Sequence, residues 1–298
     1  MCRQFIEIWE GLGKIDNFVV VEQGAHDGQF ARDVLEFAQT HSPEFFEGFR
    51  YEIIERFGVL QERQQRTLES FRRKIEWSNS LRPFTGVHFS NELLDAMPVR
   101  LIRNDTEKLV NVNGEKFVFV ERPLLKGGAA FQAPGGEPAF NQAALDWIDE
   151  VSMNLQRGYV ITIDYQRPLA CEGSACVQVR AGHRNIDSPF EQVGHADITL
   201  GVDWVSIVER ARTRGLAIAG FTDQHHFITG IISEFRSLDS PKAARELQTL
   251  LHPEMLGRAF QVLGLTKDVD PGAQPLSGFK FAGAPRSAAL TQSPASNG

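Results

Sequence analysis

Cysteine and long apolar runs are both scarce in this chain of 298 residues. Only Cys2, Cys171 and Cys176 occur, and a single C-x4-C spacing provides neither a disulfide framework nor a four-ligand zinc site. No apolar run approaches the roughly 20 residues that span a bilayer. The start MCRQFIEIWE also lacks a basic region followed by an apolar stretch. We therefore expect a cytoplasmic protein with no metal site and no membrane contact.

Positive charge is also in short supply, because 31 Lys and Arg residues stand against 38 Asp and Glu residues, for a net charge of -7. A protein that follows the phosphate backbone of a nucleic acid needs a basic surface, so we expect no nucleic-acid partner. Hydrophobic residues make up 42% of the chain, which suffices for a substantial core. One large α/β domain therefore accounts for the length, and two independent domains are not required.

Short apolar runs alternate with helical patterns along the chain. This alternation is typical of a doubly wound, mostly parallel sheet, and it predicts an α/β fold. The run GYVITIDY is apolar on both faces and is therefore predicted to be a central strand. Asp203 is predicted to cap a helix, and His225 and His226 to begin another. The predicted strands cover residues 18–22, 50–55, 86–92, 158–165, 216–222 and 278–284, and the predicted helices cover residues 29–39, 60–71, 141–155 and 204–214.

Two insertions interrupt this pattern. Residues at about 105–125 alternate in β fashion on both sides of Asn113-Gly114, which predicts a hairpin. Residues 166–200 are too long for a plain connection, so they are predicted to form an active-site loop over the strand ends. Residues 285–298 are rich in Ser, Ala and Pro and are predicted to be a disordered tail, which leaves a single domain over residues 1–284. Polar residues of the long loop could close over a substrate or bond to one another, namely His183, Arg184, Asp197 and Thr199.

The segment VVVEQGAHDGQF places a glycine-rich turn between the first strand and the first helix. Glycines let the backbone approach a ligand closely, and the helix that follows presents free N–H groups. Many α/β proteins make this connection without binding a ligand, so the turn alone is a weak signal. Glu55 strengthens it, because an acid at the end of the next strand can accept both hydroxyls of a ribose. We predict a nucleoside cofactor held by Gly24, His26, Gly28 and Glu55.

The same turn separates two classes of cofactor. Pyrophosphate cofactors need G-x-G-x-x-G, whereas the glycines here fall as G-x-H-x-G, with Glu22 two residues before the first. A carboxylate at this point repels a pyrophosphate and attracts the sulfonium and ammonium groups of S-adenosylmethionine (SAM). SAM is therefore the predicted cofactor, and an NAD(P)-dependent oxidoreductase is the less favoured alternative. Glu22 could instead be a solvated strand end.

The segment HFSNELLDAMPVR brings three polar side chains to the end of another strand. The carboxyl ends of strands form the ligand crevice of open α/β sheets, so we expect Asn91 beside the cofactor, and Glu92 and Asp95 as catalytic residues beside the substrate. Two carboxylates could grip a guanidinium and orient it toward a methyl donor. Asn91 and Asp95 could equally cap a short helix and turn. Asp164 and Tyr165 end a later strand and could line the same crevice, or Asp164 could cap the end of its strand.

These segments together resemble the MidA-like SAM-dependent methyltransferases, a family that includes the mitochondrial complex I assembly-factor arginine methyltransferase. The family patterns E-x-G-x-G-x-G and NE-x-x-DA-x-P correspond to Glu22–Gly28 and Asn91–Pro98, and the second is the more specific. ITIDYQ, VQVRAGHRN and GHADITLGVDW are similar to further family segments, and QHHFITGI and HPEMLGRAFQVLGL to its C-terminal helices. The resemblance spans nearly the whole chain and implies a class I SAM-methyltransferase fold with a Rossmann-like sheet.

The resemblance also implies an activity, namely methyl transfer from SAM to an arginine of a protein substrate, which analogy suggests is a respiratory-complex subunit. Three features depart from the family: His26 replaces a glycine, Gln166 replaces the glycine after DY, and the segment before the first strand is short. A left-handed backbone at His26 would cost only about 1–2 kcal/mol, but its side chain could crowd the cofactor. The alternative is therefore a catalytically impaired SAM-binding or interaction protein.

Overall fold

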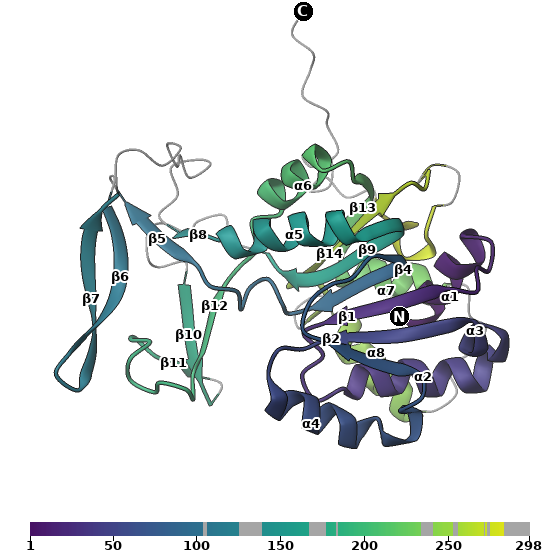
Figure 1. Ribbon diagram of the computed structural model, residues 1–298, viewed down its shortest axis with the longest axis horizontal. Helices are drawn as coiled ribbons and strands as arrows, with labels where there is room; N and C mark the ends of the chain where they lie inside the picture. The colour runs from purple at the N-terminus through teal and green to yellow at the C-terminus, as the bar shows by residue number, and fades with distance from the viewer. Residues whose placement is uncertain are drawn as a thin grey trace, which may run out of the picture.

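The computed structural model describes residues 1–103, 106–124, 139–166, 177–182, 184–233, 241–252, 256–270, 272 and 275–282. Its centre is a seven-stranded sheet of order β13-β14-β9-β4-β1-β2-β3 (Figure 1). The strands from β3 to β9 pair in parallel, and β14 runs antiparallel to both of its neighbours. The mostly parallel α/β fold expected from the sequence is thus confirmed. The strands are β1 (Phe18–Gln23), β2 (Phe49–Ile54), β3 (Ile75–Ser78), β4 (Phe84–Asn91), β9 (Leu155–Tyr165), β13 (Ala217–Asp223) and β14 (Phe260–Lys267).

Helices cover both faces of this sheet, as a doubly wound pattern requires (Figure 1). One face packs against α1 (Cys2–Gly11), α2 (Gln29–His41), α3 (Pro43–Gly48) and α7 (Gln224–Ile232). The other face packs against α5 (Gln142–Asn154) and α6 (Trp204–Thr213). The described residues also form α4 (Gly58–Thr67) and α8 (Pro241–Leu251). Apolar side chains on both sides therefore bury the central strands, which is why those strands read as continuous apolar runs.

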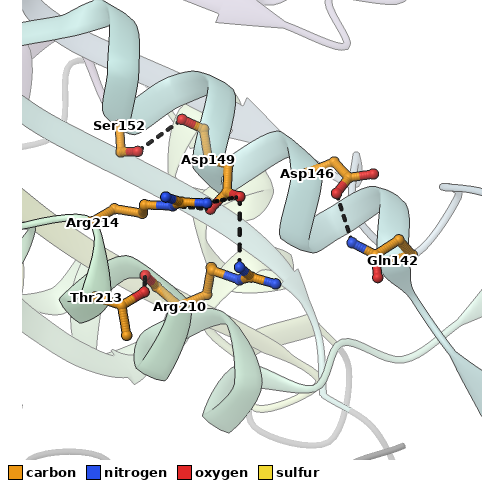
Figure 2. Close-up of polar contacts among 7 residues, drawn as sticks. All are labelled: Gln142, Asp146, Asp149, Ser152, Arg210, Thr213 and Arg214. Atoms are coloured by element: carbon orange, nitrogen blue, oxygen red, sulfur yellow. Dashed lines mark hydrogen bonds and ion pairs between the residues drawn. The ribbon is translucent and has the colours of Figure 1, made fainter. Parts of the chain in front are cut away.

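A charged cluster fixes α5 against α6 (Figure 2). The Arg214 guanidinium donates to both carboxylate oxygens of Asp149, at 2.7 and 2.6 Å, and Arg210 Nη1 lies 3.7 Å from Asp149 Oδ2. The hydrogen bond from Arg214 and the charges of both arginines lower the pKa of Asp149. These contacts join the two helices within one turn of Trp147 on α5.

Two small antiparallel sheets extend from the carboxyl side of the central sheet (Figure 1). One has the order β7-β6-β5-β8 and the other β11-β10-β12. Buried Leu200 of β12 packs with Val99, Leu101 and Val177, which ties the two small sheets together. Their strands are β5 (Arg100–Arg103), β6 (Thr106–Asn113), β7 (Lys116–Pro123), β8 (Ala139–Phe140), β10 (Val177–Ala181), β11 (Arg184–Asn185) and β12 (Asp197–Leu200).

The predicted hairpin is present, but its turn lies one residue later than expected. Asn113 pairs with Lys116, so the two loop residues are Gly114 and Glu115. Gly114 has φ +63°, which suits a two-residue turn that begins with glycine. The long loop predicted over residues 166–200 contains β10, β11 and β12, while residues 167–176 and 183 lie outside the described residues. The predicted tail, residues 285–298, also lies outside them.

Two predictions near the C-terminus are wrong. Residues 278–284 were expected to form a strand, but Ser277–Phe279 form a 3-10 helix. The Phe279 ring occupies the space left by two glycines, since a Cβ at Gly220 or Gly264 would lie 2.3 or 2.4 Å from that ring. The segment HPEMLGRAFQVLGL, which resembled a family helix, instead supplies strand β14 from Phe260 onward. This segment buries side chains on both faces, and a central strand accommodates that pattern.

The helix starts agree with the sequence. Asp203 Oδ1 accepts a hydrogen bond from Ser206 N at 3.2 Å at the start of α6. Asp223 caps α7 in the same way, by accepting from His226 N at 2.9 Å, so the His225-His226 pair does begin a helix. In the parts of the chain that the structure describes, no helix combines the length and apolar character needed to cross a membrane.

Candidate functional site

Two adjoining cavities lie where the strand order reverses between β1 and β4. The first has a volume of about 980 Å³, and its walls include Gln23, Gly24, Glu55, Phe57, Leu93 and Trp147. The second has a volume of about 1050 Å³, and its walls include Asp95, Tyr165, Arg180, Asp197 and Thr199. Three residues line both cavities, namely His26, Glu92 and Ala96. This position is the one at which open α/β sheets bind ligands.

The glycine-rich turn adopts the left-handed conformation three times. Gly24, His26 and Gly28 have φ of +86°, +48° and +84°, so the small backbone cost considered for His26 does apply. A Cβ at Gly28 would lie 3.0 Å from Leu68 Cδ1, and one at Gly24 would lie 3.3 Å from Leu93 Cδ1. The His26 side chain is 82% exposed and lies at the opening between the cavities. The positive φ therefore favours glycine at Gly24 and Gly28, the space beside Gly28 is the tighter of the two, and the turn accommodates a histidine between them.

Glu55 follows β2 and lines the first cavity, as predicted for a ribose-binding acid. Its Oε1 accepts from Phe57 N at 2.9 Å and its Oε2 from the Gln64 amide at 3.2 Å. A carboxylate has about four acceptor positions, so two remain for ligand hydroxyls. The Gln64 amide also donates to His26 O at 3.0 Å, and its Oε1 accepts from Trp77 Nε1 at 3.1 Å. Gln64 thus joins Glu55 to the glycine-rich turn, a role that the sequence pattern did not reveal.

Glu22 lies in the interior rather than on the wall of either cavity. It is 4% exposed and accepts a hydrogen bond from the Tyr51 hydroxyl at 2.8 Å. Burial raises the pKa of Glu22 from 4.5 to about 7, although the Tyr51 hydrogen bond acts in the opposite direction. The structural alternative of a solvated strand end is therefore wrong. A role for Glu22 in binding the cofactor remains a prediction.

The end of β4 and the turn that follows place Asn91 and Glu92 at the cavities, and a buried carboxylate holds that turn in position. Asp164 is 0% exposed, and its Oδ2 accepts from Leu94 N at 2.8 Å and from Asp95 N at 3.3 Å. Glu92 has φ +50°, and its N–H donates to Ile163 O at 3.0 Å. Asp164 thus acts as a strand-end cap, the second of its two interpretations.

Asp95 and Asp164 form a coupled pair of carboxyl groups. Burial and the negative charge of the neighbouring carboxylates raise the pKa of both, with Glu92 acting on Asp95 and Asp95 acting on Asp164. Because two buried carboxylates in contact resist simultaneous ionisation, the pair shares a proton near neutral pH. Asp95 is 4% exposed yet contributes to the wall of the second cavity. It is therefore the member of the pair that a ligand can reach.

The second cavity carries more acid than base. Glu92, Asp95 and Asp197 line it, and Arg180 is the one guanidinium among its described lining residues. Asp197 and Thr199, which could close over a substrate or bond to one another, both line this cavity. Arg184 lies on exposed β11, and His183 lies outside the described residues. Tyr165, at the end of β9, also lines this cavity. The structure adds Arg180, whose position depends on the pairing of β10 with β12.

Comparison with known proteins identifies the family. Residues 1–222 match the family described as "putative S-adenosyl-L-methionine-dependent methyltransferase". The chain belongs to this family. An uncharacterised protein from Burkholderia thailandensis is 25% identical, with a TM-score of 0.80 over 94% of this chain and 80% of that one. A methyltransferase-like protein from the same organism, crystallised with S-adenosyl-homocysteine (SAH), is also 25% identical, with a TM-score of 0.79 over 94% of this chain and 78% of that one.

SAM is therefore the cofactor of this methyltransferase, in preference to a nicotinamide dinucleotide. The residues present fit it. Glu55 retains acceptor positions that face the first cavity, Gly24 presents backbone without a side chain, and the cavity has the volume of a small-molecule site. Glu55, Gly24 and Asn91 would hold the nucleoside and amino-acid portions. The methyl group would then lie toward His26 and Glu92, where the second cavity begins.

Proposed function

We propose that this methyltransferase modifies an arginine side chain of a protein in the cytoplasm. One observation carries the proposal: a cavity lined by Glu92, Asp95 and Asp197 meets the cofactor cavity at Glu92. Carboxylates there suit a guanidinium, which is planar, cationic and able to bond in a bidentate manner. The similarity of Asn91–Pro98 to the MidA pattern supports the same substrate class. The same similarity favours a respiratory-complex subunit as the protein acceptor.

The site's own residues would do three things during transfer. SAM, when bound, supplies an electrophilic methyl group. Glu92 would hold the guanidinium with one nitrogen in line with that methyl group, and alignment of this kind accounts for much of the rate in displacement reactions. The nitrogen would gain the methyl group as the methyl–sulfur bond breaks and SAH leaves, and the proton that the nitrogen loses would pass to the Asp95 carboxylate. Its raised pKa makes the Asp95 carboxylate a stronger base than an exposed one.

The test is methyl transfer from labelled SAM to a protein extract from cells that lack this enzyme, followed by hydrolysis and identification of the labelled residue. We expect methylarginine as the product. Glu92→Gln should lower turnover by tenfold or more and change SAH affinity by less than about threefold, because it removes a charge from the acceptor side. Glu62→Gln, an exposed change on α4, should leave both unchanged. Label on another residue type, or equal loss of turnover and affinity in Glu92→Gln, would contradict the proposal.

A further inference from the structure

Gln23, the last residue of β1, is held by two aromatic side chains at the base of the cofactor cavity. Its Oε1 lies 3.1 Å from Trp147 Nε1 of α5 and 3.3 Å from His88 Nε2 of β4. Trp147 is 3% exposed and His88 is 0% exposed, and their rings meet edge to face at 5.6 Å. Because both rings are packed in the core, Gln23 has one fixed hydrogen-bond partner on α5 and another on β4.

The tryptophan determines which way the Gln23 amide points. An indole Nε1 can only donate a hydrogen bond, so the group that faces Trp147 must be the Gln23 carbonyl oxygen. The flipped amide would set an N–H₂ group against the indole N–H, and two buried donors would face each other without an acceptor. The Gln23 Nε2 group must therefore point away from Trp147.

His88 agrees with this orientation. To donate to Gln23 Oε1, His88 must carry its proton on Nε2, which leaves Nδ1 as a bare acceptor. His88 Nδ1 is a buried atom without a hydrogen-bond partner in the part of the chain that the structure describes. A protonated Nδ1 would be a buried donor with no acceptor, which is the more costly arrangement. Burial also lowers the pKa of His88 to about 3, so the ring stays neutral at physiological pH.

The amide N–H₂ group of Gln23 is left for the cavity. Gln23 is half-buried and lines the first cavity, and no described residue accepts a hydrogen bond from its Nε2. In the proposed arrangement the methyl end of the cofactor would lie at the junction with the second cavity, where His26 and Glu92 line both cavities. Trp147 lines the first cavity alone, so the part near Gln23 and Trp147 is left for the adenosine half.

From this geometry we infer that Gln23 is a specificity-determining residue whose amide N–H₂ donates to an acceptor of the adenosine half of the cofactor. The inference rests on SAM as the cofactor of the proposed function, and it is independent of the identity of the methyl acceptor. Trp147 and His88 are positioning residues, because they set the amide orientation before the ligand arrives. A donor that needs no reorientation costs little to use in binding.

Calorimetric titration of the full chain with SAH and with 5′-methylthioadenosine tests this. The second ligand carries the adenosine half without the amino-acid portion. Gln23→Leu should weaken both ligands by about tenfold to a hundredfold, since a ligand acceptor would be buried without its donor. Gln178→Leu makes the same change on the wall of the second cavity and should leave both affinities within about twofold of the wild type.

Gln23→Glu covers the case in which Gln23→Leu folds poorly. The carboxylate still accepts from Trp147 and His88, but it presents an acceptor where the amide presented a donor, so a loss of at least tenfold is expected while the thermal unfolding of the chain remains cooperative. A folded Gln23→Glu or Gln23→Leu chain could instead bind SAH and 5′-methylthioadenosine within twofold of the wild-type affinities. This result would overturn the role of the amide and leave SAM binding itself untouched. Failure of the wild-type chain to bind SAH would overturn that role together with the methyltransferase function.

Discussion

Glu22→Gln should change how the stability of this protein depends on pH. The Glu22 pKa rises from 4.5 in the unfolded chain to about 7 in the folded one, so between these values the folded state binds more protons than the unfolded state. Wild-type stability must then fall as the pH rises through this window. A shift of this size corresponds to a loss of about 2.5 kcal/mol in the free energy of unfolding between pH 5 and pH 8, since one pKa unit is about 1.36 kcal/mol. Glutamine has no proton to lose and removes this contribution.

Urea unfolding of both chains at a series of pH values measures the effect. The difference in the free energy of unfolding, Glu22→Gln minus wild type, should increase by about 2.5 kcal/mol from pH 5 to pH 8, because the contributions of other titrating groups cancel in the difference. The value at pH 5 will also contain the cost of placing an amide N–H₂ beside the Tyr51 hydroxyl. Glu62→Gln, at an exposed position, should give a flat difference. A flat difference for Glu22→Gln would refute the argument that burial governs this carboxyl group.

Three further changes address the site. Glu55→Ala should weaken SAH binding by tenfold or more in calorimetry, because it removes the ribose acceptor; an affinity unchanged within twofold would contradict this role. His26→Gly should leave the free energy of unfolding within about 1 kcal/mol of the wild type. The substitution relieves left-handed strain in the folded chain, and the added entropy of glycine in the unfolded chain offsets this gain. A loss above about 2 kcal/mol in urea unfolding would show that the His26 side chain makes a stabilising contact. Asp164→Asn should lower the free energy of unfolding by about 1–3 kcal/mol, because the amide nitrogen would face a backbone N–H that now donates to the carboxylate. An unchanged melting curve at pH 8 would contradict the capping role of Asp164.

The sequence revealed those parts of the site in which a functional residue type stands at a turn or strand end that can be recognised from neighbouring residues. Gly24 and Gly28 need positive φ in a turn of fixed length, and Glu55 follows a strand by itself. Such features are visible in a few consecutive residues. The same holds for strands β1, β2, β4, β9 and β13, whose ends were predicted to within three residues.

The features that the sequence concealed depend on contacts between distant segments. Gln23 and Trp147 are separated by 124 residues, and Gln64 and His26 by 38. The residues next to a glutamine in a strand or helix do not predict which distant group it will bond to. The errors near the C-terminus have a related origin, because β14 is central only by virtue of pairing with β9 and β13. Local apolar content could not distinguish that strand from a buried helix.

The two non-glycine residues at the junction of the cavities show how the fold supports the site. Four non-glycine residues of the described chain have positive φ, and two of them, His26 and Glu92, line both cavities. Such conformations cost about 1–2 kcal/mol each and persist where surrounding contacts enforce them. Gln64 provides that contact for His26, and the Glu92 N–H provides its own through Ile163 O. Since Gln64 also bonds to Glu55, one side chain connects the predicted ribose acceptor with the backbone of His26, at the junction of the two cavities.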